Sequence, residues 1–335
     1  MPRQAVLLLA HGTPETVEQI PEYLRNVVSG RPIPQHVVEE IQHRYAQIGR
    51  SPLTEITLEQ ARLVKAELAA SGFPVTVYVG MRNWRPYIAD VVRQMRADGV
   101  EQAAVICMAP QNSRTSVGLY RRAVEAEAGS LRIHFTEGWA QHPLLAEAFA
   151  ERLRPTLSKL SQETGAPVPV LFTAHSVPTR TVQPLDSTSA TPASGRPDAS
   201  KQAEPRLWPG GQGPDPYADE ARHTAQLVAA RVPEIPRWWF AFQSQGASGG
   251  PWIGPSVEET LESIAAEGVK TLILQPIGFL CDHVEILYDV DILFKGLAVR
   301  LGIRLERPES LNASPSLAKA VSDLAQKGLI QLSDE

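Results

Sequence analysis

The chain has 335 residues, of which 43% are hydrophobic and 21% charged, and this length predicts about two globular domains or one large one. Its formal net charge of −5 disfavours a nucleic-acid-binding protein, because such proteins are usually basic. The two cysteines, Cys107 and Cys281, exclude a disulfide scaffold and any thiolate zinc or iron–sulfur site that this chain could build alone.

Short aliphatic and β-branched runs alternate with longer amphipathic runs along the whole chain. The predicted strands cover residues 4–10, 74–80, 103–109, 131–136, 168–174, 237–243, 271–277 and 303–307. The predicted helices cover residues 18–29, 34–48, 52–71, 86–98, 114–128, 142–160, 216–231, 256–267, 284–301 and 314–328. This alternation is typical of the α/β class. It predicts two similar Rossmann-like domains, each with a four-stranded parallel sheet flanked by helices, and a cleft between them.

The two halves resemble a diverged repeat. The first strand of the first half ends in Ala-His-Gly-Thr-Pro (10–14), and that of the second half ends in Ala-His-Ser-Val-Pro (174–178). Ligands of such sheets bind outside the carboxyl ends of the strands. We therefore expect His11 and His175 to approach one cleft from opposite sides. We expect residues 1–138 and a returning helix at 312–335 to form one domain, and residues 139–311 the other.

One segment departs from the repeat. Residues 181–213 contain five prolines and four glycines with few large apolar side chains, a composition that predicts a flexible insertion. The apolar run at 5–10 is too short for a signal peptide, and the longest apolar run, 271–281, contains Gln275 and Pro276. We therefore expect no integral membrane segment and a cytoplasmic location.

The segment 278–291 is rich in groups that could carry chemistry. It follows an apolar strand and contains Asp-His-Val-Glu (282–285) and Asp289. Glu285 and Asp289 are four residues apart, so they share a helix face and repel each other unless a cation lies nearby. An acidic first turn that complements the helix dipole is an equal alternative.

His11 and His175 could each cap a turn, but their equivalent positions in the repeat favour a shared site. Imidazole with a carboxylate suits Fe²⁺, Zn²⁺ or Ni²⁺ better than Mg²⁺ or Ca²⁺. No short multi-ligand spacing occurs, so the pattern predicts an open site for a metal that passes through rather than a closed structural site.

A polar group near the N-terminus contains Arg31, Arg44, Tyr45 and Ser51. Its guanidinium and hydroxyl groups could hold carboxylates, or they could form a solvated helix face. The glycine-rich segment 246–254 is neither a dinucleotide fingerprint nor a P-loop, which disfavours a dinucleotide enzyme.

The chain resembles the ferrochelatases almost from end to end. The residues that carry the resemblance are 10–14, 44–45, 51–53, 116–120, 173–178, 215–217, Phe-Gln-Ser-Gln (242–245), Pro-Trp-Ile-Gly-Pro (251–255), 278–279 and 282–285. The resemblance implies a lyase that inserts Fe²⁺ into a porphyrin in haem biosynthesis. Iron would then be a substrate, and we expect no resident cofactor.

The resemblance also assigns roles to individual residues. His175 and Glu285 would bind the incoming iron and help remove the pyrrole protons, with Asp289 as a weaker metal ligand. His11 would be an axial ligand of the product iron, at a position where the best-known relatives have tyrosine. The expected contacts to the macrocycle and its propionates come from Arg44, Tyr45, Ser51, Tyr120, Ser244 and Arg31.

Two other departures concern the periphery of the site. Val28 and Ser29 stand where relatives have an arginine, and Arg31 could substitute for it. Leu293 stands where the acidic ridge of relatives continues, which weakens an outer metal site.

Enzymes that use protoporphyrin carry a longer apolar segment before the Arg-Tyr element, whereas here only residues 29–43 precede it. The chain is therefore most similar to coproporphyrin III ferrochelatases, and the resemblance suggests the downstream coproheme decarboxylase as a partner. The alternatives are a protoporphyrin IX ferrochelatase, a haem-binding or haem-transfer protein without turnover, and a cobalt or nickel chelatase acting on a corrin precursor.

Overall fold

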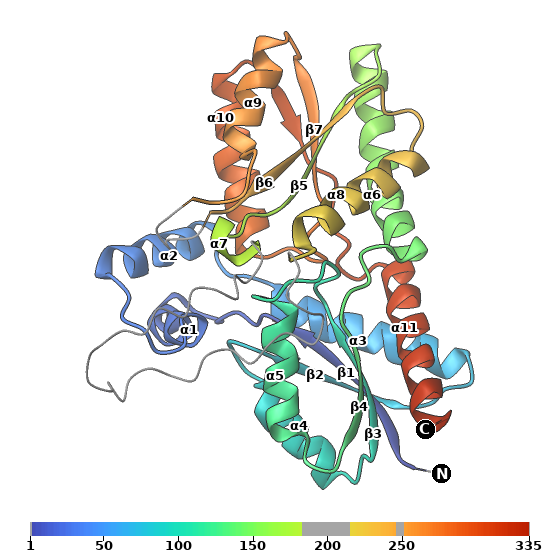
Figure 1. Ribbon diagram of the computed structural model, residues 1–335. Helices are drawn as coiled ribbons and strands as arrows, with labels where there is room; N and C mark the ends of the chain where they lie inside the picture. Colours follow the sequence, from blue (N-terminus) through green and yellow to red (C-terminus); the bar gives the residue numbers. More distant parts are fainter. Residues whose placement is uncertain (1, 183–214, 246–250, 335) are drawn as a thin grey trace, which may run out of the picture.

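The computed structural model describes residues 2–182, 215–245 and 251–334, and it contains two four-stranded parallel sheets (Figure 1). The first sheet has the order β2-β1-β3-β4 and the second the order β6-β5-β7-β8. The strands are β1 (Gln4–Ala10), β2 (Thr76–Met81), β3 (Gln102–Cys107), β4 (Arg132–Thr136), β5 (Val170–His175), β6 (Trp238–Gln243), β7 (Thr271–Pro276) and β8 (Arg304–Glu306). The predicted α/β class with two similar sheets is confirmed, and the identical strand order supports an origin by duplication.

Helices cover both faces of each sheet. On the first sheet, α3 (Leu53–Ala70) and α11 (Pro315–Asp334) lie on one face, and α4 (Ile88–Ala97) and α5 (Val117–Ala128) on the other. On the second sheet, α6 (Pro143–Thr164) and α8 (Tyr217–Arg231) lie on one face. Its other face packs against α9 (Val257–Ala266), η2 (Glu285–Phe294) and α10 (Lys295–Arg300).

The central strands are buried on both faces, as parallel strands between helices must be. Leu8 of β1 and Phe172 of β5 belong to the same hydrophobic cluster, which runs from the first sheet to the second. Their neighbours Leu7 and Leu171 point to the opposite faces and join two separate clusters. The shared cluster therefore joins the two sheets through α6 and α11.

Helix α11 packs against α3, β3 and β4 and also contacts α6. In Figure 1 it runs down along the first sheet, so that both termini lie near the same end of the molecule. The C-terminal segment thus returns to the first sheet, while the exact domain limits at 138 and 312 stay a prediction.

Two predicted features need correction. The single helix expected at 284–301 is a π-helix, η2, followed by the α-helix α10. The first two residues of the segment expected as an insertion at 181–213, Thr181 and Val182, are part of α7 (Thr179–Val182). The rest of that segment lies outside the described residues.

A small separate cluster covers one side of the region between the sheets. It is formed by the 3₁₀ turn η1 (Val17–Gln19) and the helices α1 (Ile20–Val27) and α2 (Gln35–Ile48). Tyr23, Tyr45 and Trp84 are buried in it, and Val284 packs against it from the start of η2. The α1–α2 hairpin is therefore anchored to the segment that carries Glu285.

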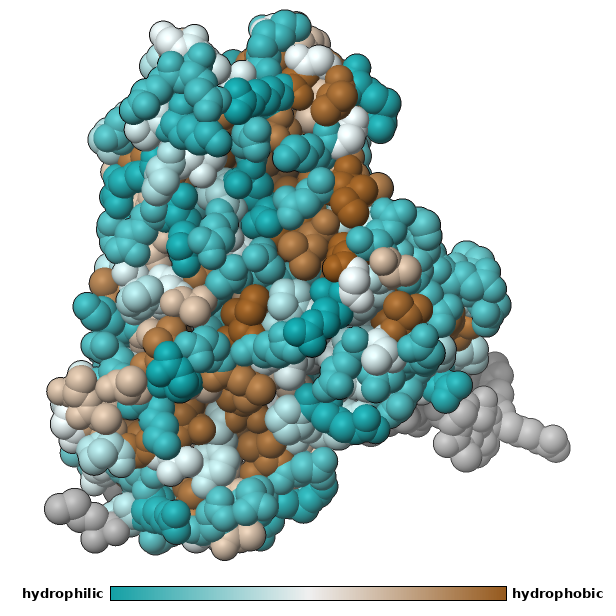
Figure 2. Space-filling model, turned by 180° about the vertical axis from the view of Figure 1, so that it is seen from behind, coloured by the Kyte–Doolittle hydropathy of each residue, from teal (hydrophilic) through white to brown (hydrophobic). Residues whose placement is uncertain are grey.

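The rear face of the molecule is mainly hydrophilic, with hydrophobic residues in small groups (Figure 2). The large hydrophobic side chains exposed among the described residues are Leu58, Ile292, Leu293, Val299 and Ile330. Within the described ranges, no helix is long and apolar enough to cross a membrane.

The backbone after His11 depends on Gly12, which has a φ of +78°. A Cβ at this position would lie 2.8 Å from the Cβ of Met81 and 3.0 Å from that of Trp84. The turn that presents His11 therefore needs glycine both for its left-handed conformation and for the close approach of the β2–α4 segment.

We predict that Gly12→Ala lowers the free energy of unfolding by about 2–4 kcal/mol, because the left-handed penalty of about 1–2 kcal/mol adds to the steric overlap. Gly72→Ala is the matched control, since Gly72 has a φ of +84° but no atom within 4 Å of the added Cβ. It should cost only about 1–2 kcal/mol. Urea denaturation of both variants measures the difference, and equal costs would contradict the steric argument.

Candidate active site

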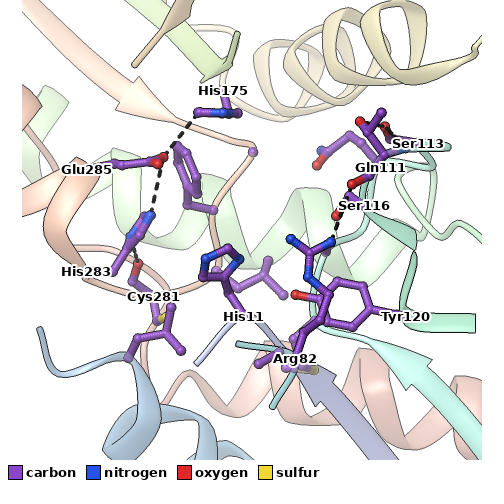
Figure 3. A pocket seen from close by; sticks show the side chains of 18 of the residues that line it. His11, Arg82, Gln111, Ser113, Ser116, Tyr120, His175, Cys281, His283 and Glu285 are labelled. Atoms are coloured by element: carbon purple, nitrogen blue, oxygen red, sulfur yellow. Dashed lines mark hydrogen bonds and ion pairs between the residues drawn. The ribbon is translucent and has the colours of Figure 1, made fainter. Parts of the chain in front are cut away.

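A pocket of about 380 Å³ lies where the carboxyl ends of the two sheets meet, and residues of both halves line it. His11 follows β1 and His175 ends β5, which occupy the same place in the strand order of their sheets. Figure 3 shows the two imidazoles on opposite sides of the cavity. The structure thus brings the two histidines to one cleft, as the repeat predicts. The volume is within the range of sites for small organic ligands.

Glu285 and His175 form the centre of one side of the pocket. The Nδ1 atom of His175 lies 3.2 Å from Oε2 of Glu285, and Nε2 of His283 lies 3.7 Å from the same oxygen. About a third of each side chain of the closer pair is exposed (33% and 32%), and both residues line the cavity. One carboxylate oxygen is therefore shared by two imidazoles at the edge of the open space (Figure 3).

The charges of this pair stabilise each other. Desolvation opposes ionisation of Glu285, but His175 and His283 outweigh it and hold the pKa of the carboxyl well below its usual range. Desolvation also lowers the pKa of His175, but the charges of Glu285 and Asp289 outweigh it and raise that pKa. The metal-free pair therefore favours an imidazolium beside a carboxylate, and a bound cation would replace the proton on His175.

His11 has the opposite electrostatic setting. Its Nε2 atom lies 2.9 Å from the hydroxyl of Tyr23, and the side-chain amide of Asn83 lies 3.1 Å from the same nitrogen. Desolvation, helped by the positive charge of Arg82, lowers the pKa of His11 to about 3. His11 is consequently a neutral imidazole at physiological pH, the form that can donate a lone pair to a metal.

Asp289 lies one turn beyond Glu285 and is held by two other predicted site residues. Its carboxylate accepts hydrogen bonds from the hydroxyl of Ser244 and from Nη1 of Arg44, the latter at 3.3 Å. Desolvation, followed by repulsion from Glu285, raises the pKa of Asp289 to about 6. Arg44 also pairs with Glu40 of its own helix. Its guanidinium therefore binds carboxylates of this chain, and Arg44 does not line the pocket.

The wall opposite Glu285 offers hydrogen-bond donors. Arg82 lies with its guanidinium carbon 5.4 Å from the centroid of the Tyr120 ring. Ser113 and Ser116 lie on the same side of the cavity (Figure 3), and Thr115 of the same segment also lines it. This combination of one cation, an aromatic ring and hydroxyl groups suits a flat ligand with carboxylate substituents.

The remaining predicted contacts lie away from the cavity. Tyr45 and Ser51 are buried outside the pocket lining, and Arg31 is exposed with its Nε bonded to the carbonyl of Val28 at 3.0 Å. Of the expected substrate contacts, Tyr120 alone is among the residues that line the pocket. The substrate-binding roles assigned to all of these residues, Tyr120 included, stay predictions.

Arg82, His283, Ser113 and Thr115 line the site but were not predicted from the sequence as site residues. Arg82 follows β2 directly, so the rule that sites form at the carboxyl ends of strands could have identified it. His283 belongs to the Asp-His-Val-Glu segment, but its contact with Glu285 depends on the loop before η2. Within the described part of the chain, no group of three His, Cys, Asp or Glu side chains is arranged to hold a metal ion.

Comparison with known proteins agrees with this geometry. The ferrochelatase family model matches residues 3–329. The chain is 59% identical to a ferrochelatase of Acidobacterium capsulatum over 331 residues, which are 98% of this chain and 96% of that relative. It is 34% identical to a coproporphyrin III ferrochelatase of Mycolicibacterium vanbaalenii, over 96% of this chain and 88% of that relative.

Among solved structures, the sirohydrochlorin chelatase SirB of Bacillus subtilis subspecies spizizenii has a TM-score of 0.56 at 10% identity. The alignment covers 99% of this chain and 98% of SirB, and at this identity it shows a shared fold. The family model and the close relatives cover nearly the whole chain, including the pocket. The chain therefore belongs to the ferrochelatase family, the enzymes that insert ferrous iron into a porphyrin.

Proposed function

We propose that this ferrochelatase acts in the cytoplasm on coproporphyrin III and Fe²⁺ and releases coproheme, with no resident cofactor. The observation that carries the proposal is the short connection between α1 and α2. Only residues 28–34 join the two helices, so the chain lacks the longer apolar segment that is typical of protoporphyrin enzymes. The downstream coproheme decarboxylase is the expected acceptor of the product.

The chemistry of the wall supports the same choice. Coproporphyrin III carries four propionates, whereas protoporphyrin IX has two propionates and two apolar vinyl groups. Arg82 and the hydroxyl groups of Ser113, Thr115 and Ser116 provide donors for carboxylates on one side of the cavity. A relative named coproporphyrin III ferrochelatase, alignable over 96% of this chain, adds support.

In the proposed reaction, the porphyrin lies between the two histidines and is bent so that its nitrogen lone pairs point towards the incoming metal. Such distortion costs roughly 1–5 kcal/mol, which remote contacts to the propionates offset. Iron enters from the side of His175 and Glu285. Binding of Fe²⁺ displaces the proton of His175. As the iron passes into the ring, its bonds to His175 and Glu285 break and two Fe–N bonds replace the two N–H bonds, so these two side chains are free to accept the two pyrrole protons.

The first test compares turnover on the two porphyrins under anaerobic conditions with Fe²⁺. We expect a kcat/KM at least about tenfold higher for coproporphyrin III, because each additional charge-assisted hydrogen bond contributes about 1.5–3 kcal/mol. The change in Soret absorption measures product formation. Faster turnover of protoporphyrin IX would assign that substrate instead, and binding without multiple turnovers would indicate a haem carrier.

We predict that His175→Ala abolishes iron insertion while the porphyrin dissociation constant changes less than about twofold. The side chain is one of the two proposed iron ligands and leaves the donors of the opposite wall intact. His134→Ala is the control, since His134 lies on β4 outside the pocket lining and should keep wild-type kcat. If His175→Ala weakens porphyrin binding as strongly as it reduces turnover, His175 holds the substrate instead.

His11→Ala should retain iron insertion within several fold but change the electronic spectrum of the bound product. The reason is that neutral imidazole is a strong axial ligand of haem iron. Absorption and resonance Raman spectra of the product complex measure the change. Identical spectra for the variant and the wild type would exclude His11 as the axial ligand.

A further inference from the structure

The segment Asp215-Pro-Tyr217 precedes and begins α8, and the proposed reaction gives it no role. Helix α8 belongs to the second half of the chain, where it packs against α6 and β6. In Figure 1 it lies at the level where the two halves meet. Its first turns contact both sides of the pocket, which makes the segment a candidate for positioning the site.

Three side chains on or just before α8 bind residues 111–114, the segment that follows β3 of the first sheet. The side chain of Asp215 is fully buried, and its Oδ2 accepts the backbone N–H of Arg114 at 2.8 Å. Oε2 of Glu220 accepts the backbone N–H of Asn112 at 2.6 Å. Nε2 of Gln111 donates to Oγ1 of Thr224 at 3.2 Å. We call these three contacts the α8 brace.

The brace is built as a set. Glu220 and Thr224 are four residues apart and lie on the same face of α8. In two of the three contacts a carboxylate accepts a backbone N–H group. Such charge-assisted hydrogen bonds are stronger than hydrogen bonds between neutral groups. A Cβ at Gly138 would lie 3.0 Å from the Cβ of Asn112 and 3.4 Å from Oε2 of Glu220. The chain between β4 and α6 therefore closes tightly over the brace.

The same helix also holds the iron side of the pocket. The hydroxyl of Tyr217 donates to the backbone carbonyl of His175 at 2.8 Å. Tyr217 is 8% exposed and also lines the cavity. Oδ1 of Asp215 accepts the backbone N–H of Tyr217 at 3.0 Å. A single carboxylate thus joins the start of α8, which touches His175, to the segment that leads to the opposite wall.

That segment continues directly into the wall. Ser113, Thr115 and Ser116 line the cavity, and Tyr120 follows on the first turns of α5. Any change in how residues 111–114 sit on α8 would move these side chains relative to His175. Insertion of a metal into a held macrocycle needs both sides at a fixed separation, because misplacement by about 1 Å costs catalysis heavily.

We propose that Asp215, Tyr217 and Glu220 are positioning residues that fix the porphyrin-binding wall opposite the iron-binding pair. Asp215 and Glu220 hold the wall, and Tyr217 holds the strand end that presents His175. None of the three needs to touch the reacting atoms. The inference rests on the proposed roles of His175 and of the wall, but it holds for either porphyrin.

The test measures the kinetic constants for the porphyrin and for Fe²⁺ separately. The two oxygens of Asp215 accept the backbone N–H groups of Arg114 and Tyr217. Asp215→Asn therefore places an amide NH₂ against one of these two N–H groups. Because Oδ2 faces the wall segment and Oδ1 faces Tyr217, this variant should raise the KM for the porphyrin about tenfold and also lower kcat/KM for Fe²⁺. Tyr217→Phe should lower kcat/KM for Fe²⁺ about tenfold and leave the porphyrin dissociation constant within twofold.

Tyr78→Phe is the matched control for Tyr217→Phe. The hydroxyl of Tyr78 also donates a hydrogen bond, 2.6 Å long, to Asp98, but Tyr78 does not line the pocket. It should lower the melting temperature and leave both kinetic constants unchanged. Glu220→Gln is the milder variant of the brace, and it should raise the porphyrin KM about threefold. It serves as the test of the wall if Asp215→Asn does not fold.

The assays use the full chain at a temperature well below unfolding, with whichever porphyrin the wild type turns over faster. If the proposed porphyrin substrate is wrong, the wild-type enzyme will turn over protoporphyrin IX faster. The comparison between the variants and the wild type stays valid in that case. The proposal is overturned if the variants lower the melting temperature but keep wild-type kinetics. It is equally overturned if the apparent kcat falls only in proportion to the folded fraction while the KM values for both substrates stay at wild-type levels, because that result indicates a structural role alone.

Discussion

The negative charge of Glu285 is the interaction on which the rest of the pocket depends. Its carboxylate lies within 3.2 Å of His175 and 3.7 Å of His283, and it repels the neighbouring Asp289. A carboxylate in such a setting stays ionised only while cationic or donor groups surround it. The site therefore attracts positive charge. In the free enzyme a proton on His175 supplies it, and in the proposed reaction a metal ion does.

The architecture explains why so much of the site could be predicted from the sequence. Parallel sheets present all their carboxyl ends at one edge, and the repeat of Ala-His at the end of the first strand of each half places His11 and His175 at equivalent edges. Once the two edges face each other, the histidines must share a cleft. Glu285 follows from the same logic, since η2 begins shortly after β7.

Other features of the site depend on tertiary contacts that no local sequence pattern reveals. Arg44 has a long side chain that could reach a ligand or a protein carboxylate, and the fold provides Asp289 and Glu40 close by. Arg82 belongs to no recognisable motif and becomes part of the site only through its position after β2. The π-helical form of η2 has no distinct pattern, because its apolar spacing resembles that of an ordinary helix.

Two imidazoles at equivalent positions of the two sheets have opposite electrostatic properties. Burial of His11, helped by the positive charge of Arg82, lowers its pKa to about 3, and its neighbours Tyr23 and Asn83 are neutral. His175 faces Glu285, so its pKa rises. In the proposed reaction, this difference in pKa gives the two histidines different roles. The imidazole that exchanges a proton lies beside the carboxylate, where a departing pyrrole proton can be held. The permanently neutral imidazole lies across the macrocycle, where it can bind the metal only after insertion has brought iron into the ring.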